Sequence, residues 1–96
     1  MHVVGYLIKK TYICGDKDGQ FEIIGQGRAV LDSSPNYEDK LYRLGDVFVT
    51  NRIAQNSLKS IKRDDKDPDS SMYEIVPVMN NRHVDITKTV YGIHPA

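Results

Sequence analysis

The sequence predicts a small α+β domain, and three patterns carry that prediction. The first third of the chain alternates as two β-strands around a turn, the residues after 50 follow a helical period, and residues 72–92 again read as two strands. We expect two antiparallel β-hairpins plus a middle strand, forming a twisted sheet or small partial barrel, with one or two short helices. With 96 residues, the chain is typical of a single domain spanning 1–96.

The first hairpin is expected to turn at the segment from Asp16 to Gly19, where Asp favours the start of a turn and Gly supplies a positive φ. If Gly15 pairs with Gln20, directly opposed residues share a face of the sheet. Cys14 then lies on the buried face as an inert core thiol. In this register the apolar face collects Val4, Tyr6, Ile8, Tyr12, Cys14, Phe21, Ile23, Ala29 and Leu31.

Two positions on this predicted apolar face, Gly25 and Gly27, have no side chain. Glycine inside a strand marks a bulge, a bend or the close approach of another group. In one interpretation the glycines let the sheet coil, and a bulge turns Lys10 outward. In the other they form the floor of a shallow pocket, with Lys10 and Tyr12 on its rim.

The middle of the chain is expected to contain a short helix, a short strand and a longer helix. Ser34 as the cap and Pro35 as the first helical residue favour a helix to Arg43. Residues 46–51 read as the strand because Val and Phe favour that structure, although a helical phase also fits them. The longer helix begins at a cap on Thr50 or Asn51 and ends near Arg63. Its expected core stripe is Ile53, Ala54, Leu58 and Ile61.

The polar segment at about residues 63–71 contains Pro68 and reads as a mobile loop. A second hairpin is expected after it, with strands at Met72–Met79 and Arg82–Gly92 and a turn at Asn80-Asn81. Pro77 cannot donate a backbone hydrogen bond. The sequence therefore places the first of these strands at or near an edge of the sheet.

Composition narrows the classes of function. Thirteen basic and thirteen acidic residues cancel, so the chain has no global field that would attract nucleic acid or a membrane. With no signal peptide or membrane-spanning run, the expected location is the cytoplasm. Cys14 and the histidines lack the spacing of metal ligands, so we expect neither a metal site nor a cofactor. The histidines are His2, His83 and His94.

Tyrosine content favours a protein-binding or assembly module. The chain has six Tyr and no Trp, and Tyr is enriched at protein interfaces because it buries area at a low entropy cost. The alternative interpretation is that the tyrosines form part of the core. The candidate interface residues are Tyr6, Tyr12, Tyr73 and Tyr91. We expect a partner protein or self-association through an edge strand, as in the compact accessory or inhibitor proteins that phages and bacteria encode.

Two other functions remain open. A basic face on the longer helix would suit nucleic acid, unless it is only a solvated surface. Its residues are Arg52, Lys59, Lys62 and Arg63. A small enzyme or ligand-binding domain would use the glycine-floored pocket of Lys10, Gly25 and Gly27. No catalytic motif supports an enzyme, so the sequence favours a non-enzymatic protein.

Overall fold

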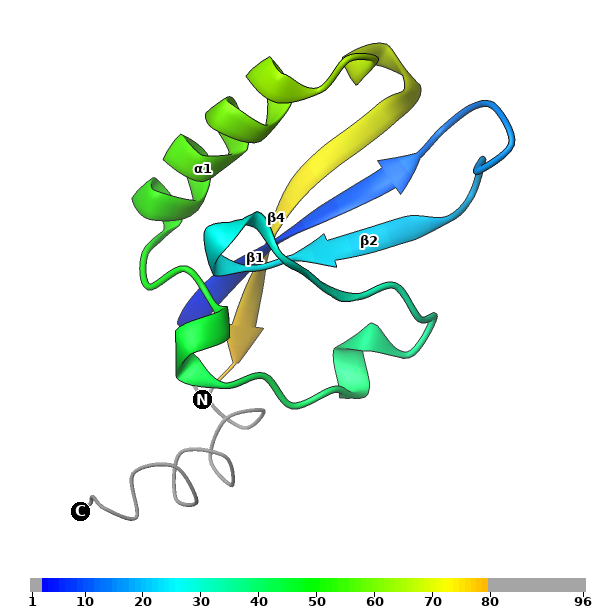
Figure 1. Ribbon diagram of the computed structural model, residues 1–96. Coiled ribbons are helices and arrows are strands. Elements are labelled where there is room, and N and C mark those ends of the chain that lie inside the picture. The colour runs from blue at the N-terminus through cyan, green and yellow to red at the C-terminus, as the bar shows by residue number, and fades with distance from the viewer. Residues whose placement is uncertain (1–2, 80–96) are drawn as a thin grey trace, which may run out of the picture.

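The computed structural model describes residues 3–79, which form one four-stranded antiparallel sheet and one α-helix (Figure 1). The sheet order is β3-β2-β1-β4, and the sheet is open rather than closed into a barrel. This architecture confirms the α+β prediction. The elements are β1 (Val3–Tyr12), β2 (Phe21–Ile24), β3 (Val30–Asp32), α1 (Asn51–Asp64) and β4 (Ser71–Met79). Short 3-10 turns lie at Gln26–Arg28, Tyr37–Asp39, Leu44–Asp46 and Pro68–Ser70.

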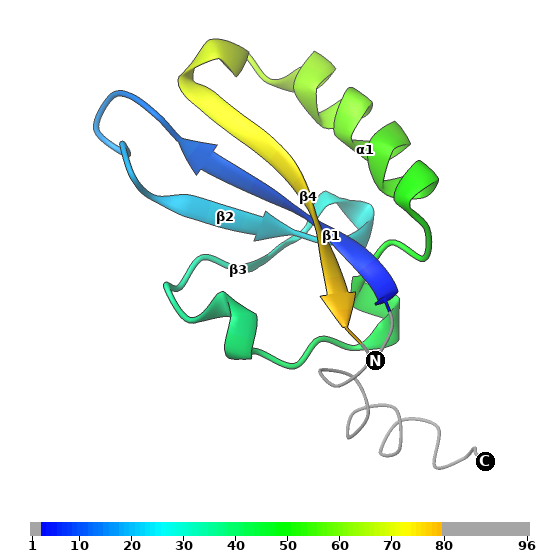
Figure 2. The same ribbon diagram turned by 180° about the vertical axis from the view of Figure 1, so that it is seen from behind.

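Both faces of the sheet are covered. Helix α1 packs on one face, where Ile8 and Ile24 are buried against Phe48 and Ala54. The segment between β3 and α1 covers the other face (Figures 1 and 2). The buried residues of that second cluster are Leu7, Ile23, Tyr42, Val47 and Val78. Because successive residues of a strand point to opposite faces, the neighbours Leu7 and Ile8 serve different cores.

The predicted hairpin of β1 and β2 exists, but its predicted register is wrong by three residues. Thr11 pairs with Phe21, whereas the predicted register, with Gly15 opposite Gln20, would place Cys14 opposite Phe21. The strands close at Tyr12 and Gln20, since the Tyr12 N–H donates to the Gln20 carbonyl at 2.8 Å. The longer connection at 13–19 contains two glycines in the left-handed region, with φ of 81° and 86°. An odd shift moves side chains to the opposite face, so the predicted single apolar face is also wrong.

This register corrects the predictions for Cys14, Lys10 and the glycines. Cys14 is exposed in the hairpin connection and is not a core thiol. Lys10 pairs with Glu22, so it does not lie beside the two glycines as the predicted pocket requires. Gly25 is buried directly after β2, whereas Gly27 lies in an exposed 3-10 turn with a φ of 79°.

The predicted helix from Ser34 to Arg43 is absent, and a 3-10 turn at Tyr37–Asp39 stands in its place. The Asp32 carboxylate accepts a hydrogen bond from the Ser34 N–H at 2.9 Å, which forms a turn instead of a helix cap. Tyr42 is buried, and its hydroxyl donates to the Tyr37 carbonyl at 3.2 Å. Burial of this ring against the sheet therefore overrides the local helical preference.

The predicted strand at 46–51 is reduced to a single bridge in which Phe48 and Tyr6 exchange two backbone hydrogen bonds of 2.8 Å. The helix after it is confirmed. Thr50 caps α1, because its hydroxyl oxygen accepts from the Ile53 N–H at 3.1 Å. Ala54 is fully buried and Leu58 packs beside it, but Ile53 is 46% exposed and does not belong to the core stripe.

Strand β4 confirms the strand predicted at Met72–Met79, and its position at one edge of the described sheet agrees with the argument from Pro77. It pairs along nearly its whole length with β1, from Val3 opposite Met79 to Tyr12 opposite Ser71. The predicted partner strand Arg82–Gly92 and the turn at Asn80-Asn81 lie outside the described residues.

The burial of Gly25 predicts a large cost for adding one methyl group. An ideal Cβ at Gly25 would lie 2.2 Å from the Asp46 carbonyl oxygen and 2.4 Å from Leu31 Cδ1. We expect Gly25→Ala to lower the free energy of unfolding by about 1–3 kcal/mol, measured by urea denaturation. Gly45→Ala is the matched control, since a Cβ there has no heavy atom within 4 Å. Equal stability of the two variants would contradict the close approach at Gly25.

Candidate functional site

The outer edge of β4 has backbone groups with no strand partner among residues 3–79. Hydrogen bonds of β1 show which groups these are. Tyr6 and Tyr12 direct both their N–H and C=O away from β4, to Phe48 in one case and to the β2 side in the other. The N–H of Ile13, in contrast, donates to the Ser70 carbonyl at 2.9 Å on the β4 side. Even-numbered residues of β1 therefore bond away from β4, and odd-numbered residues bond toward it.

This alternation determines which groups of β4 point outward. Pro77 lies opposite Tyr6, Ile75 opposite Ile8 and Tyr73 opposite Lys10, so all three are non-hydrogen-bonded pairs with β1. Their backbone groups point to the outer edge of β4, which has no strand partner within residues 3–79. This edge offers N–H donors at Tyr73 and Ile75 and carbonyl acceptors at all three residues. Pro77 has no N–H, so its ring shortens the run of donors without costing a bond to β1.

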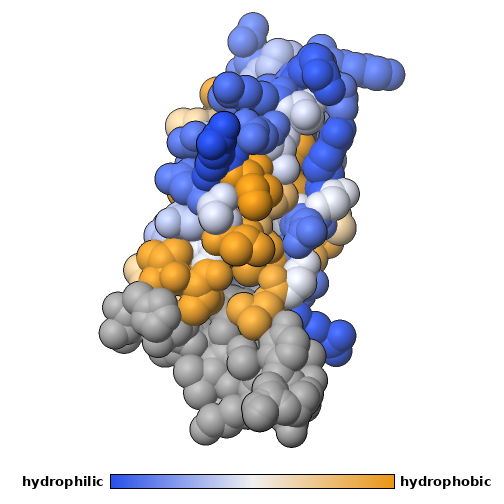
Figure 3. Space-filling view, turned by 90° about the vertical axis from the view of Figure 1, so that its left-hand side faces the viewer, coloured by the Kyte–Doolittle hydropathy of each residue, from blue (hydrophilic) through white to orange (hydrophobic). Residues whose placement is uncertain are grey.

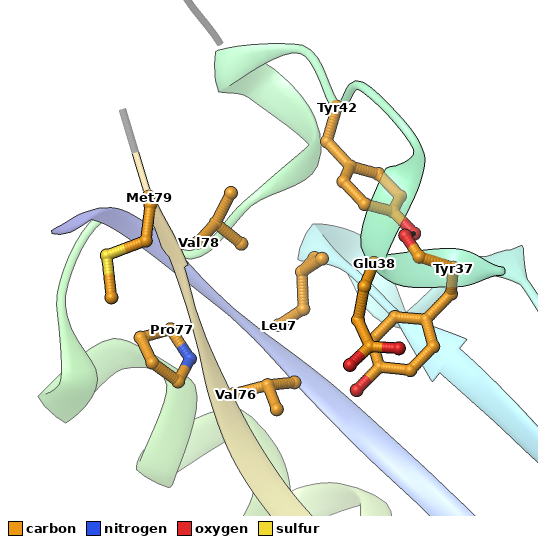
Figure 4. Close-up of a pocket in the computed structure, with 8 residues that line it drawn as sticks. All are labelled: Leu7, Tyr37, Glu38, Tyr42, Val76, Pro77, Val78 and Met79. Carbon is orange, nitrogen blue, oxygen red and sulfur yellow. Dashed lines mark hydrogen bonds between the residues drawn. The ribbon is translucent and has the colours of Figure 1, made fainter. Parts of the chain in front are cut away.

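A groove lies beside this edge, on the face of the sheet that α1 does not cover. We call it the edge groove, and its volume is about 230 Å³. Figure 4 shows the rings of Tyr37 and Tyr42 facing the end of β4 across Leu7. The lining residues are Leu7, Tyr37, Glu38, Tyr42, Val76, Pro77, Val78 and Met79. The groove therefore joins an apolar floor to the exposed end of a sheet edge.

Glu38 is the one charged side chain among the described residues that line the edge groove. It is exposed, and its carboxylate has no hydrogen bond or ion pair within residues 3–79. Lys9 is directed to the neighbouring rings, with its ammonium 4.8 Å from the centroid of Phe21 and 4.9 Å from that of Tyr37. An unpaired carboxylate at the wall of an apolar groove favours a cationic group in any ligand.

A second cluster joins the end of α1 to the sheet on the opposite face. The Tyr73 hydroxyl donates to the Asp65 carboxylate, and the Lys10 ammonium lies 3.7 Å from the same carboxylate. Lys10 and Lys62 each lie 5.7 Å from the centroid of the Tyr73 ring. The side chains of Lys10 and Asp65 are 18% and 13% exposed, so this interaction is partly shielded from water.

The pKa values in this cluster show how its groups stabilise one another. Burial, reinforced by the hydrogen bond to Asp65, raises the pKa of Tyr73 to about 12. The Tyr73 hydroxyl and the Asp67 N–H lower the pKa of Asp65. Burial alone would lower the pKa of Lys10, but the oxygens of Tyr73, Tyr12 and Asp65 outweigh it and raise that pKa. The groups satisfy each other, so the cluster fixes α1 against β4.

The tyrosines predicted to bind a partner occupy different places. Tyr6 and Tyr73 pack partly buried against the α1 core. Tyr12 is partly exposed near the hairpin connection, where its hydroxyl donates to Glu22 at 3.1 Å. Tyr91 lies outside the described residues. The structure does not gather the described three into one surface patch, whereas Tyr37 and Tyr42 together line the edge groove.

The predicted basic face is present on α1. Arg52, Lys59 and Arg63 are exposed and fall on one stripe of the helix, directly opposite Ala54. Acidic residues follow the stripe at its end, where Arg63 lies 3.7 Å from Asp64. Lys62 stands apart from the stripe, against the Tyr73 ring. The stripe is therefore a solvated helix face whose C-terminal end is partly neutralised.

The predicted pocket of Lys10, Gly25 and Gly27 is not assembled. Lys10 contacts the Tyr73 and Asp65 cluster, Gly25 lies against Asp46 and Leu31, and Gly27 has no heavy atom within 4 Å of an added Cβ. Sequence reasoning missed the residues of the edge groove. The one usable signal was Pro77, which marked β4 as an edge strand but did not reveal that Tyr37 and Tyr42 fold back beside it.

Exposed apolar residues also gather on another side of the molecule. Figure 3 shows apolar surface across the middle of that side and polar surface above it. At the start of β1 and around the start of α1, the exposed large apolar residues are Val3, Val49 and Ile53.

Within residues 3–79 no three His, Cys, Asp or Glu residues cluster as metal ligands. The helices described have neither the length nor the apolar character needed to cross a membrane.

Comparison of the chain with models of protein families, with curated proteins and with solved structures finds no match. The chemistry of the edge groove, the β4 edge and the α1 face is therefore the basis for assigning a function.

The raised pKa of Tyr73 predicts a loss of stability at alkaline pH. The folded protein holds the phenol protonated up to about pH 12, whereas the ordinary value is 10.0. The stabilisation is therefore complete below pH 10 and is lost as the pH rises toward 12. We expect Tyr73→Phe to cost about 1 kcal/mol near neutral pH and to flatten the alkaline decline, measured by urea denaturation from about pH 9 to about pH 12.

Tyr37→Phe is the matched control, because it removes a tyrosine hydroxyl on the opposite face of the sheet and leaves Tyr73, Asp65 and Lys10 in place. We expect this variant to keep the wild-type decline. A decline of equal size in the Tyr73→Phe variant would show that Tyr73 does not cause it.

Proposed function

We propose that this protein is a non-enzymatic binding module that docks on a partner protein by pairing an extended segment of that partner with the free edge of β4. The observation that supports this proposal most directly is the edge groove, which lies next to outward-facing backbone groups of the same strand. Backbone hydrogen bonds to a sheet edge supply affinity for an extended segment, and a pocket beside the edge supplies specificity for its side chains.

Three features of β4 support this proposal. Tyr73 and Ile75 offer outward N–H groups opposite non-hydrogen-bonded positions of β1. The groove beside them is lined by Val76, Val78 and Met79 from the same strand. A side chain directly opposite Val76 or Val78 on an added strand would lie on the face that contains the groove. One bound segment can therefore use the edge and the groove together.

Nucleic-acid binding by the α1 stripe is the alternative. It would depend on Arg52, Lys59 and Arg63, which lie at the solvent face of α1, away from the edge groove. Phosphate binding weakens steeply with salt because counterions are released on binding, whereas binding in an apolar groove beside one carboxylate depends only weakly on salt. The two functions therefore predict different responses to salt, to nuclease and to substitution.

A matched pair of substitutions on β4 tests the proposal. Met79 lines the edge groove, whereas Met72 is 55% exposed at the other end of the strand. We expect affinity capture from a nuclease-treated bacterial lysate to recover the same partner with the wild type and with Met72→Asp. Met79→Asp should reduce that recovery about tenfold, since a desolvated charge in an apolar site costs at least 1.4 kcal/mol. Quantitative mass spectrometry measures the recovery.

Lys59→Glu is the control for the alternative function, and it should leave the recovery unchanged. Thermal unfolding of each variant checks that the fold is intact. If Met79→Asp recovers as much partner as the wild type does, the edge groove does not contribute to partner binding and this part of the proposal is wrong. Recovery that requires nucleic acid, falls with salt and is lost in Lys59→Glu would instead assign binding to the α1 stripe.

A further inference from the structure

We infer that the occupant of the edge groove is an extended segment of a partner protein that carries an apolar side chain next to a lysine or arginine. This inference rests on the proposed function and specifies the chemistry of its partner. The apolar side chain would fill the groove, and the cationic side chain would pair with Glu38.

Charge complementarity supports a cationic partner segment. Glu38 is exposed at the groove wall and has no hydrogen bond or ion pair within residues 3–79. Glu74 is also exposed, without such a contact among those residues. It lies two residues before Val76 on β4, so its side chain is on the same face as the groove. Among residues 3–79, two carboxylates without a hydrogen bond or ion pair thus lie on the face of the sheet that contains the groove.

Among the described residues, the cation that is paired with Glu74 in the sheet is directed to aromatic rings instead. Lys9 pairs with Glu74 in the sheet, but its ammonium lies over the rings of Phe21 and Tyr37 at 4.8 and 4.9 Å. A cation supplied by the partner would therefore complete the electrostatics of this face. Lysine and arginine suit the position because their aliphatic stems cover apolar surface while the charged ends stay in water.

The backbone of β4 limits how the partner segment can bind. The Pro77 carbonyl can accept a hydrogen bond at the outer edge of β4, but Pro77 cannot donate one, so the outward donors of this stretch are Tyr73 and Ile75. A segment that continues the sheet would protect these two amides from exchange with solvent. The amide of Glu74 faces β1 and serves as an internal reference, since it is already in the ladder.

The test uses the full chain and a phage-displayed library of random peptides as the probe. We expect the selected peptides to share an apolar residue with Lys or Arg close to it, and to be lost when selection uses Met79→Asp. For a synthetic peptide of the selected sequence, Glu38→Gln should weaken binding about two- to fivefold at low salt, as a partly exposed ion pair allows.

Two controls isolate the ion pair. Asp39→Asn removes the neighbouring charge, which is not part of the groove lining, and should leave the affinity unchanged. A peptide in which Met replaces the basic residue should bind wild type and Glu38→Gln equally, which closes a double-mutant cycle. Hydrogen exchange should show that Tyr73 and Ile75 exchange rapidly in the free protein and slowly with peptide.

The other outcomes of these experiments would overturn the inference, the proposed function, or both. Peptides that need Met79 and protect the two amides, but show no basic preference and no coupling to Glu38, would overturn this inference and leave the proposed function standing. Selection of no peptide would overturn both. Amides protected in the free chain at every concentration would identify residues 80–96 as the occupant. Protection that grows with concentration would identify a second copy of the chain.

Discussion

Strand β1 is the constraint on which the rest of the structure depends, because every layer of the fold contacts it. β2 and the Phe48 bridge lie along one side, and β4 lies along the other. Leu7 faces the core beneath the segment that precedes α1, while Ile8 faces α1 itself. A one-residue shift of β1 would exchange these two side chains between cores of different shape. The alternation of β1 therefore fixes the position of both covering layers.

The α1 layer is held at its two ends by different interactions. At its start, the Thr50 hydroxyl caps the helix, and Phe48, which precedes the cap, pairs with Tyr6 of β1 through two backbone hydrogen bonds. At its end, the Asp65 carboxylate connects to Tyr73 and Lys10. Partly buried polar contacts of this kind depend on all of their partners, since removal of one leaves the others desolvated without compensation.

The opposite layer contains little regular structure, and this is why it can form a groove. Residues 33–46 cover the sheet with turns, and the buried ring of Tyr42 holds them in place. Turns leave gaps that a straight helix with a continuous apolar stripe would fill. The edge groove lies in such a gap, between Tyr37 and the end of β4. The same lack of a helix that contradicts the local prediction at Ser34 produces the candidate site.

The sequence by itself determined the elements whose signal is local. These are the α+β class, the hairpin of β1 and β2, the Thr50 cap with helix α1, and strand β4. Pro77 also indicated that β4 lies at an edge of the sheet. Alternation, capping and proline chemistry act over a few residues and need no tertiary information. Register and site were decided only by the tertiary structure. The hairpin connection is longer than predicted, with Gly15 and Gly19 in the left-handed region, and this length sets the register of β1 and β2. In this register Cys14 is exposed and Lys10 is separated from Gly25. The groove required Tyr37 and Tyr42 to pack beside a strand more than thirty residues away, because burial of large rings outweighs local helical preference.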